Sequence, residues 1–222
     1  TSNWGTIELR RAIAKFLQER YGISYAPENE ICVTIGASEG IDLALRAICE
    51  PGDEVLVPDP AYVSYQPGII FAGAIPVPVV TRAEDEFKLT AEAVRAAITP
   101  RTKALILPYP NNPTGAILTR GELTAIADVL RGTDIFVISD EIYSELTYGG
   151  AHHVSFASIP GMWERTVTLN GFSKAFAMTG WRIGYACAPA AMMKPMVKIH
   201  QFTIMCAPTA AQMAAFEGLR DG

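Results

Sequence analysis

NGFSKAFAMTGWRIGY, residues 170–185, places two cations in an otherwise apolar stretch. Lys174 has small or apolar residues on its C-terminal side as far as Trp181, apart from Thr179, and no acidic residue lies within several positions of it. Burial among such residues disfavours the ammonium form, and a neutral lysine can attack a carbonyl carbon. A lysine that extends from a packed loop into solvent is the more common explanation of such a fragment when it stands alone.

Two further motifs lie nearer the N-terminus, PNNPTG at 110–115 and SDEIY at 139–143. Together with SKAFAMTGWRIGY at 173–185, they resemble, in the same order, the motifs of fold-type-I, pyridoxal-phosphate-dependent aminotransferases of class I/II. The resemblance covers nearly the whole chain, and three motifs in register are far more specific than any one of them. It implies an α/β fold, a three-layer αβα sandwich with a mostly parallel central sheet, and pyridoxal 5'-phosphate as the cofactor.

Composition and charge limit the functions open to the chain. Its 222 residues are 50% hydrophobic and 18% charged, which is enough for a substantial core in one large domain. The net charge of −5 and the lack of a basic run argue against nucleic acid and anionic membranes as partners. No apolar run is long enough to span a membrane, and no secretory signal pattern opens the sequence.

The cysteines and histidines predict neither disulfides nor a metal site. No CxxC pair occurs among the four cysteines, Cys32, Cys49, Cys187 and Cys206. Without a secretory signal, we expect reduced thiols and a cytoplasmic protein. His152 and His153 are adjacent in a Gly/Ala loop, and a metal site formed by these two alone is not expected.

Short apolar runs alternate with helical patterns, which is typical of a largely parallel sheet with crossover helices. Strands are expected at residues 31–35, 54–57, 75–79, 104–107, 135–139, 167–169 and 184–186. Helices are expected at residues 6–21, 90–98, 119–131 and 190–219. Thr119 and Glu122 form a capping-box pattern, Thr90 is the expected N-cap of its helix, and Pro208 is expected to interrupt the last helical stretch. No linker or repeat divides the chain, so residues 1–222 are expected to form one domain.

The turn Gly36-Ala37-Ser38 follows a predicted strand and opens a helix. Small residues let the backbone approach a ligand, and the exposed N–H groups of a first helical turn suit a phosphate. Ser38 would serve equally well as a simple N-cap, and the sequence of the turn does not decide between the two. The resemblance assigns Gly36, Ala37 and Ser38 to the cofactor phosphate.

Tyr62 and Asn112 follow two other predicted strands. Tyr62 is expected above the carboxyl edge of the sheet, where α/β folds bind ligands, although an isolated tyrosine is more often a core or rim residue. Two prolines and a glycine restrict the PNNPTG loop, which either holds the Asn112 amide in place or simply turns the chain. The resemblance assigns Tyr62 to stacking on the pyridine ring and Asn112 to the 3' oxygen, and gives Asn111 no role.

Asp140 ends the apolar run 135–139, and a buried carboxylate is costly unless it meets a cation or several donors. A protonated pyridinium nitrogen is such a cation, and the pairing keeps the ring an electron sink. The structural alternative for Asp140 is the N-cap of a short turn. The resemblance favours the cofactor role and brings Tyr143 within reach of the 3' oxygen. Glu141 is expected to face solvent or to make a structural ion pair.

Lys174 completes the set that the resemblance implies. It would form the Schiff base with the cofactor aldehyde, and its freed amine would move the proton between the substrate Cα and C4'. Arg182, eight positions further along, matches the family's phosphate arginine, and Ser173 is a candidate second donor. Some relatives carry a phosphate-binding serine three positions before the lysine, where this sequence has Gly171. Either Ser173 compensates, or the phosphate has one contact fewer.

The resemblance therefore implies a transaminase that exchanges an amino group between an L-amino acid and a 2-oxo acid, with Lys174, Asp140 and Tyr143 as the catalytic residues. A β-lyase or related α-carbon enzyme would use much the same cofactor contacts and stays as an alternative. A third is the ligand-sensing domain of a transcription regulator. Such proteins need an N-terminal winged-helix module, and their lysine segment resembles SKxLxPGLRLGY more closely. The amino acid used as substrate is not indicated.

The resemblance also implies parts of the protein beyond this large cofactor-binding domain. The family continues into a smaller C-terminal domain with the arginine that binds the substrate α-carboxylate, and residues 190–222 are expected to lead there. In relatives a tyrosine of the neighbouring subunit reaches the phosphate, and TSNWG at 1–5 resembles the segment directly after that tyrosine. A homodimer with the cofactor site at its interface is implied.

Overall fold

A computed structural model describes residues 1–221, and Gly222, the last residue of the expected domain, lies outside the described part. Its centre is a seven-stranded sheet with the order β1-β7-β6-β5-β4-β2-β3. The strands are β1 Ile31–Thr34, β2 Glu54–Asp59, β3 Ile75–Val80, β4 Thr102–Leu107, β5 Phe136–Asp140, β6 Thr166–Gly171 and β7 Gly184–Cys187. Only β7 runs against the other strands. All seven predicted strands are present, and the prediction of a mostly parallel sheet is confirmed.

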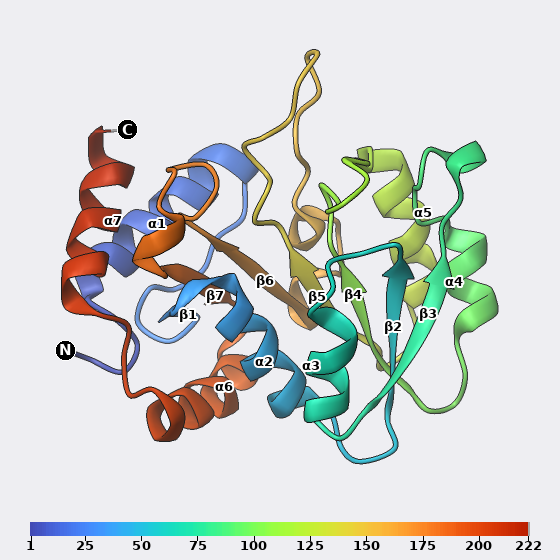
Figure 1. Ribbon diagram of the computed structural model, residues 1–222, viewed down its shortest axis with the longest axis horizontal. Coiled ribbons are helices and arrows are strands. Elements are labelled where there is room, and N and C mark those ends of the chain that lie inside the picture. Colours follow the sequence, from blue (N-terminus) through green and yellow to red (C-terminus); the bar gives the residue numbers. More distant parts are fainter. Residues whose placement is uncertain (222) are drawn as a thin grey trace.

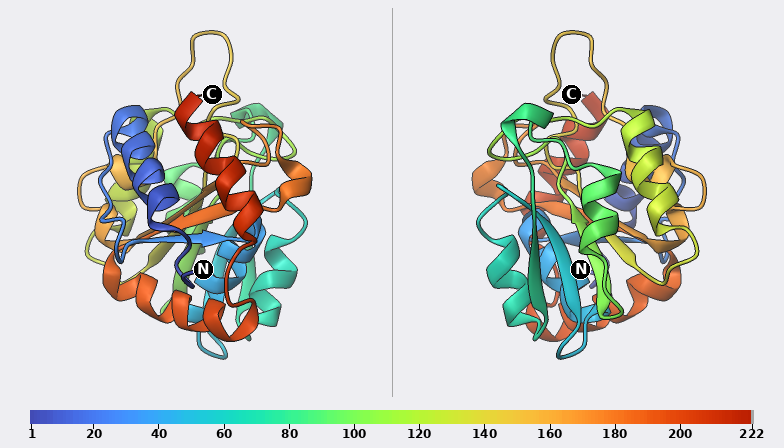
Figure 2. Two further views of the ribbon diagram at one scale, coloured as in Figure 1. Left: turned by 90° about the vertical axis from the view of Figure 1, so that its left-hand side faces the viewer. Right: turned by 90° about the vertical axis from the view of Figure 1, so that its right-hand side faces the viewer.

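Helices cover both faces of this sheet, so the predicted three-layer sandwich is confirmed (Figures 1 and 2). One face carries α2 Gly36–Ile48, α3 Tyr65–Phe71 and α6 Ala190–Thr203. The other carries α1 Ile7–Tyr21, α4 Ala91–Ala97, α5 Arg120–Leu130 and α7 Thr209–Asp221. Short 3-10 helices lie at Ala83–Asp85, Phe156–Ser158, Trp163–Arg165 and Thr179–Trp181. Successive strand residues alternate between the faces, so Val55 packs beneath the first helices and Leu56 beneath the second.

The helix ends follow local sequence signals. The Thr119 side chain accepts from the Glu122 N–H and the Glu122 carboxylate accepts from the Thr119 N–H, so the predicted capping box begins α5. Thr90 Oγ1 accepts from the Ala93 N–H at 3.2 Å and caps α4, as predicted. Pro208 lies between the end of α6 and the start of α7, which confirms the predicted interruption.

One edge of the sheet gathers segments that are far apart in sequence. The parallel strands β1, β2, β4, β5 and β6 all end there, and the antiparallel β7 begins there. The segments at this edge carry, in chain order, Gly36, Tyr62, Asn112, Asp140, Lys174 and Arg182. Ligands of open α/β sheets bind at this carboxyl edge.

The outermost strand at the other side of the sheet, β3, contains two prolines, Pro76 and Pro78. The N–H groups of Ile75 and Thr81 each donate to a backbone oxygen of the β2 segment at 2.8 Å. Odd-numbered residues of β3 therefore direct their backbone nitrogens toward β2, and even-numbered residues direct theirs away from the sheet. Both prolines occupy outward-facing positions.

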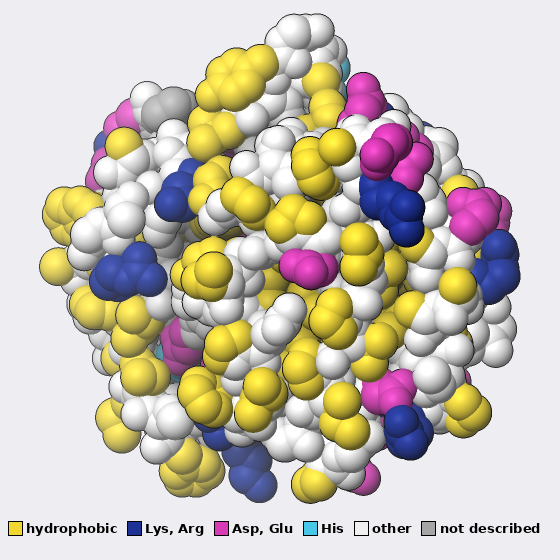
Figure 3. Space-filling model, turned by 45° about the vertical axis from the view of Figure 1, so that its right-hand side comes forward, with side chains coloured by type: hydrophobic (Ala, Val, Ile, Leu, Met, Phe, Trp, Pro, Cys, Tyr) yellow, Lys and Arg dark blue, Asp and Glu magenta, His cyan; other side chains and the backbone are white. Residues whose placement is uncertain are grey.

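Within residues 1–221, none of the helices has the length and apolar character needed to cross a membrane. The same residues include no group of three or more side chains suited to holding a metal ion. The four cysteines are free, and Cys32 and Cys187 are buried. On the face shown in Figure 3, hydrophobic side chains are widely spread, and lysine and arginine side chains form small separate groups rather than one continuous basic area.

Candidate active site

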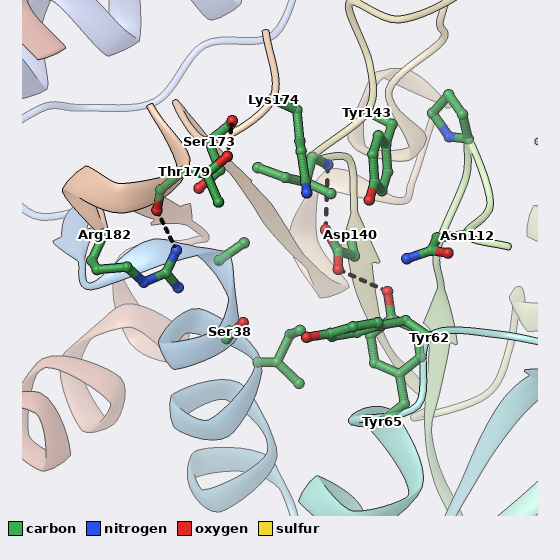
Figure 4. Close-up of a pocket in the computed structure, with 14 residues that line it drawn as sticks. Ser38, Tyr62, Tyr65, Asn112, Asp140, Tyr143, Ser173, Lys174, Thr179 and Arg182 are labelled. Carbon is green, nitrogen blue, oxygen red and sulfur yellow. Dashed lines mark hydrogen bonds between the residues drawn. The ribbon is translucent and has the colours of Figure 1, made fainter. Parts of the chain in front are cut away.

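A cavity of about 230 Å³ opens at this edge of the sheet (Figure 4). Nine of the ten residues singled out in the sequence line it, namely Ala37, Ser38, Tyr62, Asn112, Asp140, Tyr143, Ser173, Lys174 and Arg182. Gly36, the tenth, packs beside Arg182. In Figure 4, Lys174 points into the space between the Ser38 and Arg182 side and the Asn112 and Tyr143 side, with Asp140 on the floor. The geometry thus gives one site with two chemically different ends.

The turn between β1 and α2 brings backbone N–H groups to one end of the cavity. The helix begins at Gly36 with Ile35 as its N-cap. The first N–H groups of a helix have no acceptor within it, so those of the turn 36–38 are available to an anion. Because α2 begins two residues before Ser38, the alternative of Ser38 as the N-cap is wrong.

Arg182 adds positive charge at the same end. Its Nη1 donates to the Thr179 backbone oxygen at 2.9 Å, and Thr179 Oγ1 donates to the Ser173 backbone oxygen at 2.9 Å. Gly36 has a φ of +72°, and a Cβ placed there would lie 2.7 Å from Arg182 Nη2. The guanidinium therefore packs directly onto the turn with the available N–H groups, a combination that suits a phosphate.

The structure explains the glycine at position 171. Gly171 lies in β6, and a Cβ there would lie 2.9 Å from Gly184 Cα and 3.0 Å from the Ile183 backbone oxygen. A serine would push β6 and β7 apart, because both obstacles are backbone atoms. Ser173 is buried and lines the cavity two residues further on, where a hydroxyl is tolerated.

Asp140 lies on the cavity floor with few partners. Its side chain accepts from Tyr65 Oη at 2.7 Å and from the Ile142 N–H at 3.3 Å. Burial raises the pKa of Asp140 from 3.8 to about 6, the two hydrogen bonds oppose that rise, and the nearby Glu141 charge adds to it. The Ile142 contact is the turn-capping alternative, and it uses only one carboxylate oxygen. A cation in the cavity would lower this pKa again.

The expectation that Glu141 faces solvent is wrong, because its side chain is buried. Its Oε1 accepts from Ser139 Oγ and Ser155 Oγ, each at 2.9 Å, and from the Phe156 N–H at 3.2 Å. Its Oε2 lies 2.9 Å from His153 Nε2, so the expected structural ion pair forms whenever that imidazole is protonated. The carboxylate is buried because residues 153–156 fold back onto the end of β5.

The expectation that Lys174 is buried among apolar residues is wrong. Its side chain is exposed, as are Ala175 and Ala177, because this segment passes over the edge of the sheet rather than into the core. Its Nζ lies 5.4 Å from the centre of the Tyr143 ring, within the range of a cation–π contact. Within residues 1–221, the amine is therefore held above the cavity but is not desolvated.

The remaining side of the cavity is aromatic and amide in character. Tyr62 is half-buried, and its ring packs edge-on against Tyr65 with 5.6 Å between ring centroids. In the PNNPTG loop, Asn111 Oδ1 accepts from Thr114 Oγ1 at 2.9 Å. This contact fixes the loop from within and leaves the Asn112 side chain on the cavity wall.

Two of the lining residues that the sequence did not single out have polar side chains, Tyr65 and Thr179. Tyr65 begins α3, three residues after Tyr62, and nothing local in the sequence links it to Asp140. Thr179 did carry a signal, since it is the one polar residue between Lys174 and Trp181. Its contacts inside the loop show what that isolated hydroxyl does.

Comparison with known proteins finds relatives over the whole chain. The family model described as "Aminotransferase class I and II" matches residues 1–222. Bacillus subtilis YugH, whose assignment as an aminotransferase is itself provisional, is 50% identical over 222 residues, which are 100% of this chain and 57% of that protein. Aspartate aminotransferase of Pyrococcus abyssi is 46% identical over 219 residues, 99% of this chain and 56% of that protein.

A solved structure matches as well. The aromatic aminotransferase from Pyrococcus horikoshii OT3 superimposes with a TM-score of 0.97 at 47% identity, over 100% of this chain and 59% of that one. The chain spans little more than half the length of the curated relatives it matches. These relatives are named as aminotransferases, and no observation favours the lyase or the regulator.

Proposed function

The chain belongs to the class I and II aminotransferase family, and from this we propose that it is the cofactor-binding large domain of a pyridoxal-phosphate-dependent transaminase. The reaction proposed for the whole protein transfers an amino group between an L-amino acid and a 2-oxo acid. One observation carries the proposal. The amine of Lys174 and the sparsely bonded carboxylate of Asp140 face a single cavity that has an anion-binding turn at one end.

The residues present fit that cofactor. A phosphate needs positive charge and N–H donors, which Arg182 and the turn at Gly36 supply, and the close approach of the two depends on the missing Cβ. A protonated ring nitrogen needs a buried carboxylate, and Asp140 is one whose pKa is raised by burial. A ring hydroxyl needs donors, and Asn112 and Tyr143 lie on the side opposite Arg182 (Figure 4).

In the proposed mechanism each residue has a separate task. Bound pyridoxal phosphate supplies an electron sink for the bond broken at the substrate Cα. With the cofactor bound, Lys174 Nζ would hold it through its aldehyde carbon, and the freed amine would move the proton from the substrate Cα to C4'. Asp140 holds the proton on the ring nitrogen, and Tyr65 orients Asp140 through its 2.7 Å hydrogen bond. The Tyr143 ring keeps the Lys174 amine over the cavity.

For the whole protein we also propose a homodimer located in the cytoplasm. The exposure of Lys174 and the 51% exposure of Trp181 support a further layer of protein over this edge of the sheet. A second copy, in the arrangement that the resemblance of TSNWG implies, would supply part of that layer. The four free cysteines support a reducing compartment.

The test is borohydride reduction of the full-length protein after incubation with pyridoxal phosphate, followed by peptide mass mapping. We expect a phosphopyridoxyl mass on the peptide that contains Lys174, lost in Lys174→Ala and retained in Lys198→Ala, which removes an exposed lysine of α6. Labelling scattered over Lys15, Lys88 and Lys103 would contradict the proposal. Transfer of an amino group to a 2-oxo acid without release of ammonia would separate transamination from elimination.

A further inference from the structure

Behind the anion-binding turn lies a pair that the proposed mechanism does not use, the buried His200 and the partly buried Glu39. Glu39 is in the first turn of α2, and His200 is in the last turn of α6. His200 has no exposed surface, and its Nδ1 lies 2.6 Å from Glu39 Oε1. The other carboxylate oxygen, Oε2, accepts from the Ile35 N–H at 2.5 Å. Glu39 therefore links α6 to the residue directly before the turn.

The contact with Ile35 acts on the turn because Ile35 is the N-cap of α2. Gly36 follows with a φ of +72°, and a glycine has the widest choice of backbone conformations. The turn therefore keeps its shape through contacts from outside. Thr34 Oγ1 holds it from the side of β1 by donating to the Gly36 backbone oxygen at 2.9 Å, and Glu39 holds it from the side of α6.

The hydrogen bonding of His200 makes its orientation depend on Glu39. A carboxylate only accepts, so the contact requires the tautomer or ion with a proton on Nδ1. His200 Nε2 has no partner among residues 1–221. Burying a polar ring with one nitrogen unpaired costs free energy that an apolar side chain would avoid. The single contact with Glu39 is thus what the imidazole contributes at this position.

We propose that Glu39 and His200 are positioning residues for the phosphate end of the cofactor site. The pair fixes the Ile35 N–H, and through it the direction of the N–H groups in the turn 36–38 and their distance from the Arg182 guanidinium. Glu39 does not line the cavity, so it acts through the turn and does not touch the phosphate. The inference rests on the proposed function, because it concerns the same site.

The test compares the affinity of the full-length protein for pyridoxal phosphate with its affinity for pyridoxal, which lacks the phosphate, by titration of cofactor absorbance. His200→Leu removes the donor, and we expect it to weaken pyridoxal phosphate binding about tenfold while pyridoxal binding changes less than about twofold. His200→Asn places an amide N–H near the position of Nδ1 and is expected to restore most of the loss. Lys198→Ala, on the exposed side of α6, is the matched control.

A second variant tests the other member of the pair. Glu39→Gln keeps an oxygen for the Ile35 N–H and presents an amide N–H to His200 Nδ1, which can accept it in the other tautomer, so the protein is expected to fold and to lose about threefold in phosphate preference. An equal loss for both ligands in His200→Leu, or no recovery in His200→Asn, would overturn the positioning role. If the unaltered protein binds neither ligand through Lys174, the proposed function fails and this inference fails with it.

Discussion

Two neighbouring carboxylates at the end of β5 meet opposite surroundings. Asp140 is 5% exposed and has one hydroxyl and one N–H as donors. Glu141 is 1% exposed and has four partners, which come from Ser139, His153, Ser155 and Phe156. Their burial is similar, so the difference lies in how many donors each oxygen meets. A carboxylate with its lone pairs filled stabilises the fold, whereas one left short of donors in a cavity is available to a ligand.

The alternation of side chains along a strand produces this contrast. Asp140 lies on the side of the sheet that carries α2 and the cavity, and Glu141 meets Phe156, which packs in the core on the other side. Glu141 does not line the cavity, but it supports a segment that does. Its contacts with His153 and Ser155 tie the returning end of the loop that projects after β5 (Figure 1) to the start of the turn at 142–145, which contains Tyr143.

The largest effect should come from removing the charge on the cavity side. We expect Asp140→Asn to lower kcat of the full-length protein by a factor on the order of 10³, because an amide cannot hold the ring nitrogen protonated. The apoprotein should unfold in urea at the same or a higher concentration, since the variant relieves a buried charge. Activity within tenfold of the unaltered protein would erase the distinction between the two carboxylates.

The matched change on the other side should act on stability instead. Glu141→Leu leaves buried donors unpaired, so we expect the free energy of unfolding to fall by about 3 kcal/mol. Glu141→Gln keeps one oxygen for Ser139, Ser155 and Phe156 and should lose only about half as much. Urea unfolding of the three proteins measures both values. A fall in kcat without a fall in the free energy of unfolding in Glu141→Gln would contradict the structural role assigned to Glu141.

A third prediction concerns pH. Asp140 has a folded-state pKa of about 6, raised from 3.8 by burial, so the folded apoprotein binds this proton more tightly than the unfolded chain. Its contribution to stability is present below pH 4 and is lost as the pH rises to about 6, a change of about 2 to 3 kcal/mol. The contribution of Asp140 is isolated by the difference in unfolding free energy between the unaltered apoprotein and the Asp140→Asn apoprotein, measured from pH 4 to 7. A flat difference would show that Asp140 already has enough partners.

The smallest effect is expected for the one side chain that donates to Asp140. Tyr65→Phe removes the 2.7 Å hydrogen bond, and because that bond lowers the pKa of Asp140, the pKa should rise further. We expect kcat/KM to fall about fivefold and the pH window above to move upward. Tyr148→Phe, which changes an exposed hydroxyl, is the control. An unchanged window in Tyr65→Phe would remove Tyr65 from the positioning of Asp140.

Local signals predicted most of the fold. The Thr119 capping box, the Thr90 cap and the break at Pro208 depend on residues a few positions apart, so they are legible in sequence. The apolar runs located every strand, and all of them except the partly exposed edge strand β3 are largely buried between two layers of helices. Most of the cavity-lining residues could also be predicted from the sequence, because parallel strands bring the residues that follow them to one edge of the sheet.

The remaining features depend on contacts that the sequence does not display. The bond from Tyr65 to Asp140 spans 75 positions, and that from His200 to Glu39 spans 161. Glu141 looked like a solvent-facing acid because the returning segment at Ser155 is invisible locally. Lys174 looked buried because its neighbours are apolar, yet its burial is decided by whatever lies above the sheet edge.

The two prolines of β3 affect how the protein behaves at high concentration. An exposed edge strand offers unpaired N–H groups to a strand from another molecule, and this pairing starts the growth of fibrils. In β3 the outward-facing backbone nitrogens of Pro76 and Pro78 carry no hydrogen, so the N–H group of Val80 is the one outward-facing donor that β3 offers to an incoming strand. Ile75 and Val80 are exposed and apolar, which would otherwise invite such pairing. The open margin of the sheet is protected against aggregation by two missing hydrogen atoms rather than by charge.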